Sequence, residues 1–224
     1  MRRVFLIDLD LTLIDSFKGL VEAVRYVASS RGFGEIFLRL DPERFLEIYY
    51  RDDFESLLPS RDLEFRWSFW ESVWKRYVSN SPLRGKLFEC AHSALAYLRG
   101  RGLVYVTTGR EIRSCEMIHE ILDLDLRDMI HGLYTVGDFG KYTKKRDLYK
   151  IILERSEEIG FREKDIVVIS DSYRDLENAW GLGLDGVGFV SEKNFLVKEL
   201  FEKKGFRYIS SWCDHEDLVN KLLK

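Results

Sequence analysis

Several features that would mark a particular class of protein are absent from this chain of 224 residues. No apolar run approaches the ~18 residues of a membrane-spanning helix, and residues 1–5 enter a strand-like pattern without the apolar segment of a signal peptide. We therefore expect a cytoplasmic protein that has no membrane partner. The formal net charge is −3, so there is no basic excess to neutralise phosphates. Nucleic acid is not an expected partner either.

Cysteine and glutamine are also scarce. The three cysteines, Cys90, Cys115 and Cys213, are odd in number, lie far apart and form no Cys-x-x-Cys pair. This pattern favours neither a disulfide framework nor a zinc site, so we predict reduced thiols that are mostly buried in the core. Glutamine is absent and asparagine occurs only at positions 80, 178, 194 and 220, which is a bias of proteins from hot environments.

What the sequence does contain is an alternation of short apolar runs with segments of helical spacing. The apolar runs predict buried parallel strands at residues 4–9, 103–107, 166–170 and 186–190. Helical spacing of apolar residues is found between them, at 90–98, 112–122 and 148–159. Strands that alternate with helices imply βαβ units with right-handed crossovers. The expected fold class is therefore α/β, with a Rossmann-like parallel sheet.

One long stretch interrupts this alternation. Between residues 16 and 81 no run predicts a strand, whereas apolar residues recur at helical spacing at 21–28, 42–50 and 64–77. We therefore predict two domains, a core of residues 1–15 and 82–224 and an inserted helical domain of residues 16–81. Acidic residues ahead of 218–223 predict one more helix at the end of the chain.

The densest polar motif follows the first predicted strand, where Asp8 and Asp10 are separated by one residue. Side chains alternate along an extended chain, so both carboxylates can point into the crevice that open α/β sheets form at the carboxyl ends of their strands. A cation would relieve their repulsion, and Mg²⁺ favours such oxygen ligands together with phosphate oxygens. An aspartate beside the cation can also act as a nucleophile. The alternative is a turn with acidic capping residues.

Two other strand ends carry polar groups. Thr107 ends the strand at 103–107, and Thr108 and Gly109 follow it; hydroxyl and amide donors here suit a phosphate oxygen, and the glycine lets the backbone approach it. An ordinary strand-to-helix turn with a threonine cap is the alternative. Asp171 and Asp175 follow the strand at 166–170, and their spacing of four puts both carboxylates on one face of a helix or turn.

A pair of lysines lies upstream of the strand at 166–170. Either Lys144 or Lys145 could bring a positive charge that balances a transferred phosphate and the acidic residues. The alternative for each lysine is a solvated position on the surface.

In this order, the motifs resemble those of the haloacid dehalogenase superfamily of phosphohydrolases. The four motifs of that family are hhhhDxDxT, a hydroxyl residue after an apolar strand, a lysine, and GDxxxD or a close variant. The resemblance covers residues 4–190, and Ser170 stands where the family usually has glycine. The segment Ser-Pro-Leu-Arg-Gly at 81–85 is similar to phosphoglycolate-phosphatase-like members. The resemblance implies a Rossmann-like core with a helical C1 cap, formed here by residues 16–81.

The resemblance also implies roles for the acidic residues. Asp8 would be the nucleophile that takes up phosphate, and Asp10 the general acid and base that protonates the leaving oxygen and later activates water. Thr12 would support the loop of the first motif. Asp171 would bind Mg²⁺ together with Asp8 and with the backbone carbonyl of Asp10. Asp175 would be a further metal ligand or would support the others.

The resemblance leaves two choices of residue open. Thr108, with Gly109 beside it, is the preferred phosphate-binding hydroxyl, but Thr107 follows the strand equally well. Lys144 fits the third motif slightly better than Lys145, because its spacing to the helical run at 148 resembles that of the family, although the usual Lys-Pro pair is missing. Both threonines and both lysines therefore remain candidates for binding phosphate.

The second aspartate of the first motif indicates the type of chemistry. Dehalogenases proper lack it, whereas phosphatases and phosphomutases keep it, because an alkoxide leaving group needs a proton. The resemblance therefore implies a Mg²⁺-dependent phosphatase that hydrolyses a small phosphorylated metabolite through an aspartyl-phosphate on Asp8. The alternatives are a phosphomutase of a sugar phosphate and a non-catalytic binding protein on the same scaffold. The cap, with an aromatic run between residues 65 and 77, would select the substrate.

Overall fold

The computed structural model describes residues 3–51, 53–191 and 195–215. Its centre is a six-stranded sheet of order β5-β4-β1-β6-β7-β8, in which all neighbours are parallel. The strands are β1 (Arg3–Asp8), β4 (Gly102–Thr108), β5 (Gly132–Thr135), β6 (Ile166–Ser170), β7 (Asp185–Phe189) and β8 (Tyr208–Ile209). The predicted α/β class with a Rossmann-like parallel sheet is confirmed. The helix expected at 218–223 lies outside the described residues.

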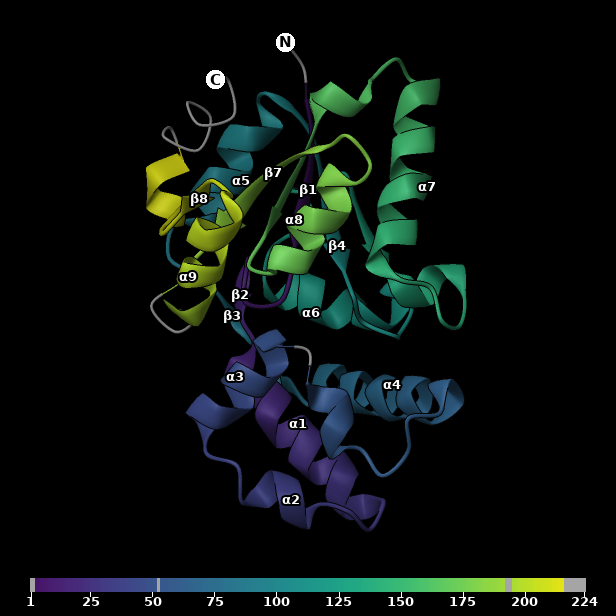
Figure 1. The fold of residues 1–224 in the computed structure, drawn as a ribbon. Helices are drawn as coiled ribbons and strands as arrows, with labels where there is room; N and C mark the ends of the chain where they lie inside the picture. Colours follow the sequence, from purple (N-terminus) through teal and green to yellow (C-terminus); the bar gives the residue numbers. More distant parts are fainter. Residues whose placement is uncertain (1–2, 52, 192–194, 216–224) are drawn as a thin grey trace.

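The central strand β1 is buried on both faces, because neighbouring residues of a strand point to opposite sides. Phe5 and Ile7 belong to one apolar cluster, and Val4 and Leu6 belong to another. Helices α5 (Ala91–Arg99) and α6 (Ile118–Asp123) contribute to the first cluster. The second cluster includes residues of α7 (Lys145–Glu158), α8 (Tyr173–Trp180) and α9 (Phe195–Lys204). The sheet therefore lies between two layers of helices (Figure 1).

Another group of helices lies beyond the carboxyl ends of the strands, in the lower part of Figure 1. We call it the helical layer. It contains α1 (Phe17–Ser30), α2 (Glu35–Leu38), α3 (Pro42–Arg51), the 3₁₀ turn η1 (Phe54–Leu57) and α4 (Leu63–Ser79). Every regular element described between residues 16 and 81 is helical. The extent of the inserted domain, residues 16–81, stays a prediction.

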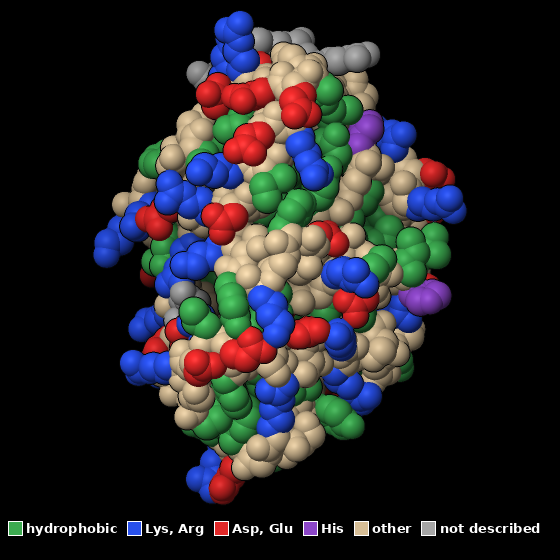
Figure 2. Space-filling view, turned by 90° about the vertical axis from the view of Figure 1, so that its right-hand side faces the viewer, with side chains coloured by type: hydrophobic (Ala, Val, Ile, Leu, Met, Phe, Trp, Pro, Cys, Tyr) green, Lys and Arg blue, Asp and Glu red, His purple; other side chains and the backbone are tan. Residues whose placement is uncertain are grey.

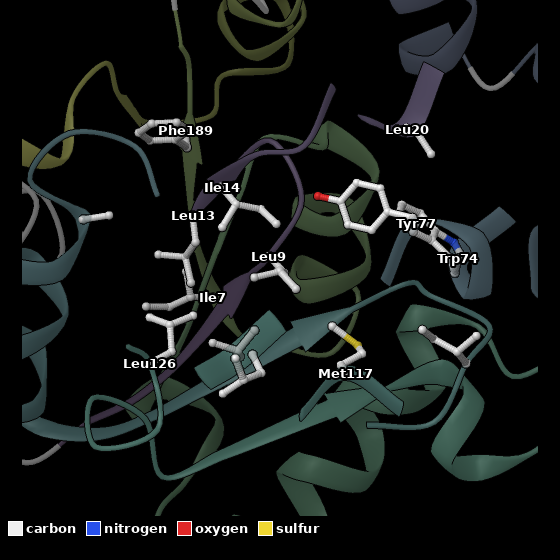
Figure 3. Packing of buried hydrophobic residues seen from close by; sticks show 14 of the residues in the cluster. Ile7, Leu9, Leu13, Ile14, Leu20, Trp74, Tyr77, Met117, Leu126 and Phe189 are labelled. Atoms are coloured by element: carbon white, nitrogen blue, oxygen red, sulfur yellow. The ribbon is translucent and has the colours of Figure 1, made fainter. Parts of the chain in front are cut away.

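The two ends of the helical layer leave the sheet side by side. Strand β2 (Ile14–Asp15) pairs antiparallel with β3 (Lys86–Leu87), and these two strands connect the layer to the rest of the chain. Leu9 and Leu13 of the loop after β1 and Ile14 of β2 belong to the same apolar cluster as Tyr77 of α4 (Figure 3). Close packing continues at Gly19 of α1, where a Cβ atom would lie 1.7 Å from the carbonyl oxygen of Leu83, so only glycine fits.

The C-terminal part of the chain returns to the sheet, where a disulfide joins Cys213 to Cys90, the residue before α5, 123 residues away. The adjacent Trp212 is buried, and its indole nitrogen donates to the carbonyl oxygen of Thr12 at 2.8 Å. Cys115 is an exposed free cysteine. The prediction of reduced and mostly buried thiols was therefore wrong. Spacing along the chain does not report which cysteines the tertiary packing brings within bonding distance.

The surface has a mixed charge. Figure 2 shows lysine and arginine side chains interspersed with aspartate and glutamate on one face of the molecule, without a continuous basic stripe on that face. Within the described part of the chain, no helix combines the length and the hydropathy that a membrane-spanning segment needs.

Candidate active site

The first candidate residues lie on a tight loop that follows β1. Asp8 ends the strand, and Asp8 and Asp10 are each 6 % exposed. The amides of Leu13 and Ile14 both donate to the carbonyl oxygen of Leu9, which closes the loop. This turn keeps both carboxylates at the carboxyl edge of the sheet, where the ends of β4 and β6 and the start of α7 contribute polar groups.

Thr12 connects this loop to the end of β6. Its hydroxyl accepts from the backbone amide of Asp171 at 2.9 Å, donates to Asp171 Oδ1 at 3.0 Å and lies 3.4 Å from Asp8 Oδ2. The hydroxyl of Tyr50 in α3 donates to Asp171 Oδ2 at 2.6 Å. Burial raises the pKa of Asp171 to about 6, although these hydrogen bonds act to lower it. Asp171 is thus a neighbour of Asp8 and a direct link to the helical layer.

Lys145, the first residue of α7, supplies a positive charge beside Asp8 and Asp175. Its Nζ contacts Asp8 Oδ1 and lies 2.5 Å from Asp175 Oδ2. Lys144 is exposed, and its backbone amide donates to the carboxylate of Asp147 at 3.0 Å. Of the two candidate lysines, the structure therefore places Lys145 beside Asp8, and not the slightly preferred Lys144. The reason is the residue at which α7 begins, because the helix turns Lys145 toward the carboxyl edge of the sheet and leaves Lys144 exposed to solvent.

The carboxyl groups of Asp8, Asp171 and Asp175, which we call the acidic group, outnumber the ammonium group of Lys145 beside them. Ser170 donates its hydroxyl to Asp175 Oδ2 at 2.7 Å, so the residue at the usual glycine position takes part in the group. Burial raises the pKa of Asp8 well above its usual range; Lys145 opposes this, and Asp175 and Asp171 add to it. Three carboxylates therefore share one ammonium group. An additional cation with oxygen ligands fits this imbalance.

The spacing of these carboxylates limits what kind of metal site they could form. In the described residues, one set of three side chains has its ligand atoms within 4.8 Å of one another, namely Glu89, Cys90 and Cys213, and its two sulfurs form the disulfide. The carboxylate oxygens of the acidic group at the sheet edge do not all lie within 4.8 Å of one another. Mg²⁺ commonly takes only one or two carboxylates, with waters and phosphate oxygens completing the shell. The donor set is therefore suited to Mg²⁺ without being a closed protein cage.

The two candidate threonines lie in different places at the end of β4. Thr108 and Gly109 line a cavity, and the Thr108 hydroxyl donates to Asp10 Oδ2 at 3.3 Å. Thr107 is completely buried and stands opposite Asp8 in the ladder between β1 and β4. Thr108 and Gly109 are therefore accessible from the cavity, whereas Thr107 lies behind it.

Arg110 is a member of the site for which no role was predicted. It is fully buried, and its Nε and Nη2 donate to the two oxygens of Asp10 at 2.9 and 2.8 Å. Its Nη1 and Nη2 also contact the carboxylate of the buried Glu120. Trp74 and Tyr77 of α4 hold their ring centroids 4.6 and 4.8 Å from the guanidinium carbon. Arg110 therefore joins the loop of the first motif to α6 and to the helical layer.

The surroundings of Asp10 determine its charge. Burial alone would raise the pKa of Asp10, but the charge and the hydrogen bonds of Arg110 outweigh burial and lower the pKa. Sequence reasoning could have suspected Arg110, because it directly follows Thr108 and Gly109 at a strand end. It offered no signal for Glu120, which lies among helical positions where a glutamate is usually solvated.

A cavity of about 320 Å³ opens above the acidic group. Its floor includes Asp8, Asp10 and Lys145, and Glu111 of the segment after β4 also lines it. The helical layer lines the other side with Tyr49, Phe54, Glu55, Arg66, Trp70 and Trp74. Of the aromatic run between residues 65 and 77, Trp70 and Trp74 thus face the cavity, whereas Phe69 is packed in the core of the layer.

Comparisons with known proteins agree with this arrangement. A family model described as haloacid dehalogenase-like hydrolase matches residues 5–189. The fold is similar to that of a predicted phosphatase from Clostridium acetobutylicum, with a TM-score of 0.76, 16 % identity and coverage of 98 % of this chain and 99 % of that one. None of the curated proteins compared with the chain matches it in sequence.

Two other solved structures have a similar fold. One is a candidate β-phosphoglucomutase from Thermotoga maritima, with a TM-score of 0.59, 22 % identity and coverage of 99 % of both chains. The other is the candidate HAD-hydrolase YfnB from Bacillus subtilis, bound to magnesium, with a TM-score of 0.56, 18 % identity and coverage of 84 % of this chain and 86 % of that one. At these identities the likeness concerns the fold.

Proposed function

This chain belongs to the haloacid dehalogenase-like hydrolase family, and we propose that it hydrolyses a small phosphomonoester in the presence of Mg²⁺ through an aspartyl-phosphate on Asp8. The observation that carries the proposal is the environment of Asp8. One of its oxygens contacts Lys145, the other lies 3.4 Å from the Thr12 hydroxyl, and the carboxylate lines a cavity of about 320 Å³. A carboxylate held from both sides and accessible from one cavity is suited to act as a nucleophile.

The phosphate group would bind at the carboxyl edge of the sheet. The Thr108 hydroxyl and the Lys145 ammonium border the cavity near Asp8; the hydroxyl would donate a hydrogen bond to a phosphoryl oxygen, and the ammonium would offset the phosphoryl charge. Asp8 and Asp171 would hold Mg²⁺, since Thr12 brings their carboxylates together. The cation would supply further positive charge to the phosphoryl group. Asp175 already accepts hydrogen bonds from Lys145 and Ser170, so we assign it the role of holding Lys145 in place rather than that of a metal ligand.

The chain's own residues would then carry out two steps. An oxygen of Asp8 attacks phosphorus, a bond forms between them, and the bond to the ester oxygen breaks while Asp10 gives that oxygen a proton. In the second step water attacks the same phosphorus, Asp10 takes a proton from this water, and phosphate leaves Asp8. Asp10 returns to its starting protonation state, so the products are an alcohol and inorganic phosphate.

Arg110 would act on this cycle through Asp10. Because it occupies both oxygens of Asp10 from the side of α6, it fixes the orientation of the carboxylate. It also lowers the pKa of Asp10, so Asp10 must take up a proton with the substrate before it can give one to the ester oxygen. The rings of Trp74 and Tyr77 cover the guanidinium, and we infer that they keep water away from this ion pair.

The test is phosphate release from an aryl phosphate and from a panel of metabolite phosphates, with Mg²⁺ or with excess chelator. We expect release that needs Mg²⁺ and a fall in kcat of at least about 10³-fold in Asp8→Asn. Asp125→Asn is the matched control, because the Asp125 side chain is 88 % exposed and lies outside the cavity. This variant should turn over like the wild type.

Other results would point to the alternatives. Transfer of phosphate to a second hydroxyl of a sugar phosphate, without release, would indicate a phosphomutase. Turnover that survives Asp8→Asn in the purified protein would overturn the assignment of the nucleophile. Phosphate esters that bind but are neither hydrolysed nor isomerised would indicate a non-catalytic binding protein.

A further inference from the structure

The side of the cavity opposite Asp8 is a wall of aromatic rings. The ring centroids of Phe54 and Trp70 are 4.8 Å apart, and those of Trp70 and Trp74 are 6.4 Å apart with an interplanar angle of 25°. Trp70 is only half-buried and lines the cavity, so part of its indole is free to contact a ligand. Aromatic surfaces of this kind favour flat rings, because stacking does not require a particular substituent.

Two polar atoms beside this wall have no partner. Among the buried side-chain nitrogen and oxygen atoms without a hydrogen bond in the described residues, two belong to residues that line this cavity, Arg66 Nε and Glu111 Oε2. Buried polar groups in folded proteins are normally paired. The unpaired donor and the unpaired carboxyl oxygen are therefore the two polar atoms beside the aromatic wall that a ligand can pair with.

The charges around these two atoms favour a neutral polar ligand over a second anionic group. Arg66 already forms an ion pair with Glu55, so its positive charge is balanced. Trp74 donates a hydrogen bond to Glu111, and burial raises the pKa of Glu111 to about 8. At neutral pH this carboxyl is mostly protonated and can both donate and accept. Arg66 and Glu111 together therefore match the mixed donor and acceptor edge of a heteroaromatic ring.

We propose that the substrate is a phosphomonoester of a heteroaromatic compound, whose ring lies against Trp70 while Arg66 and Glu111 bind the polar edge of the ring. This rests on the proposed function, because it takes the phosphate to lie at Asp8. The cavity of about 320 Å³ is at the small end of the usual range for small-molecule sites, ~300–1,000 Å³, and suits a single ligand of this kind. Nucleoside monophosphates and phosphorylated pyridines are the two sources of such a group.

The first test is binding, which does not depend on turnover. We would titrate the Asp8→Asn variant with AMP, CMP and pyridoxal 5′-phosphate, and with ribose 5-phosphate as the probe without an aromatic ring, and follow the heat of binding. At least one heteroaromatic phosphate should bind at least about tenfold more tightly than ribose 5-phosphate. Preference for AMP or CMP would identify the nucleoside source, and preference for pyridoxal 5′-phosphate the pyridine source.

The second test locates the recognition. Trp70→Leu and Glu111→Met should each reduce the ratio of affinities between the preferred heteroaromatic phosphate and ribose 5-phosphate by at least about fivefold. Trp180→Leu is the matched control, since Trp180 is 54 % exposed and lies on α8 outside the cavity, and it should leave the ratio unchanged. Circular dichroism of each variant would verify that it is folded.

The possible failures are distinguishable. If ribose 5-phosphate binds as tightly as every heteroaromatic phosphate, or if Trp70→Leu and Glu111→Met leave the ratio unchanged, this inference is overturned, whereas hydrolysis of an aryl phosphate that depends on Asp8 would still support the phosphatase. If heteroaromatic phosphates bind selectively but the wild type releases no phosphate from them, the proposed activity fails and the binding preference stands.

Discussion

The buried ion pairs of Arg110 allow a sharp prediction about stability. Arg110→Met removes the guanidinium and leaves two carboxylates, with the Glu120 side chain 0 % exposed and that of Asp10 7 % exposed. Removing one partner of a buried ion pair costs about 3–5 kcal/mol, because the other charge stays buried without compensation. We expect a loss of about 4 kcal/mol in the free energy of unfolding. For a chain of this size that corresponds to a melting temperature lower by about 8–16 °C.

The measurement is urea unfolding followed by circular dichroism, with a second variant that separates charge from packing. In Arg110→Met combined with Glu120→Met, both members of the pair become apolar at similar volume, and we expect at least half of the loss to be recovered. The control is Arg39→Met, because Arg39 and Glu35 are each 77 % exposed and such pairs contribute at most about 1 kcal/mol. A cost for Arg110→Met no larger than that for Arg39→Met would refute the reasoning.

Two further predictions concern pH and redox state. Because Glu111 has a pKa of about 8 in the folded protein and 4.5 as its usual value, the folded state holds a proton that the unfolded state loses, so stability should fall as pH rises from about 4.5 to 8. Glu111→Gln should remove this dependence of stability on pH. Relative to wild type, its free energy of unfolding in urea titrations should gain about 1–2 kcal/mol between pH 5.5 and 8, which is less than the full pKa shift implies because Glu111 is only half-buried. A difference between the two proteins that does not change with pH over that range would contradict the raised pKa of Glu111. Reduction of the bond between Cys90 and Cys213 should lower stability by about 2–4 kcal/mol, measured by thermal unfolding with and without dithiothreitol in Cys115→Ser. Thiol titration of the unreduced, denatured wild type should find one free thiol, and three would show that the disulfide is not formed.

The parts of the fold that the sequence predicted are those where local pattern and final burial coincide. Strands β1, β4, β6 and β7 are apolar runs because both of their faces are covered by helices, and each was predicted to within one residue at either end. Strand β5 (Gly132–Thr135) and strand β8 (Tyr208–Ile209) escaped prediction, since they are short and lie at the two edges of the sheet. An edge strand needs no continuous apolar run, so its sequence resembles a loop.

The candidate site divides in the same way. Asp8, Asp10 and Asp171 could be found because each lies at or just after the end of a predictable strand, and a parallel sheet gathers its strand ends at one edge. Contacts that depend on how helices pack against the sheet leave no comparable pattern in the sequence. The choice of Lys145 over Lys144 depends on the residue at which α7 begins, and the partnership of Arg110 with Glu120 depends on how α6 packs against the sheet.

The order in which the strands occur along the chain also has a consequence during synthesis. Strand β1 is made first, yet it lies in the middle of the sheet, where Val4 pairs with Leu103 and with Ile166. At ~5–20 residues per second, a ribosome needs several seconds to reach the first of these partners and longer to reach the second. The helices between Phe17 and Ser79 pack against one another and are complete before either partner exists. We therefore expect the nascent chain to acquire its helical layer first, while the apolar strand β1 stays unpaired until β4 and then β6 have been made.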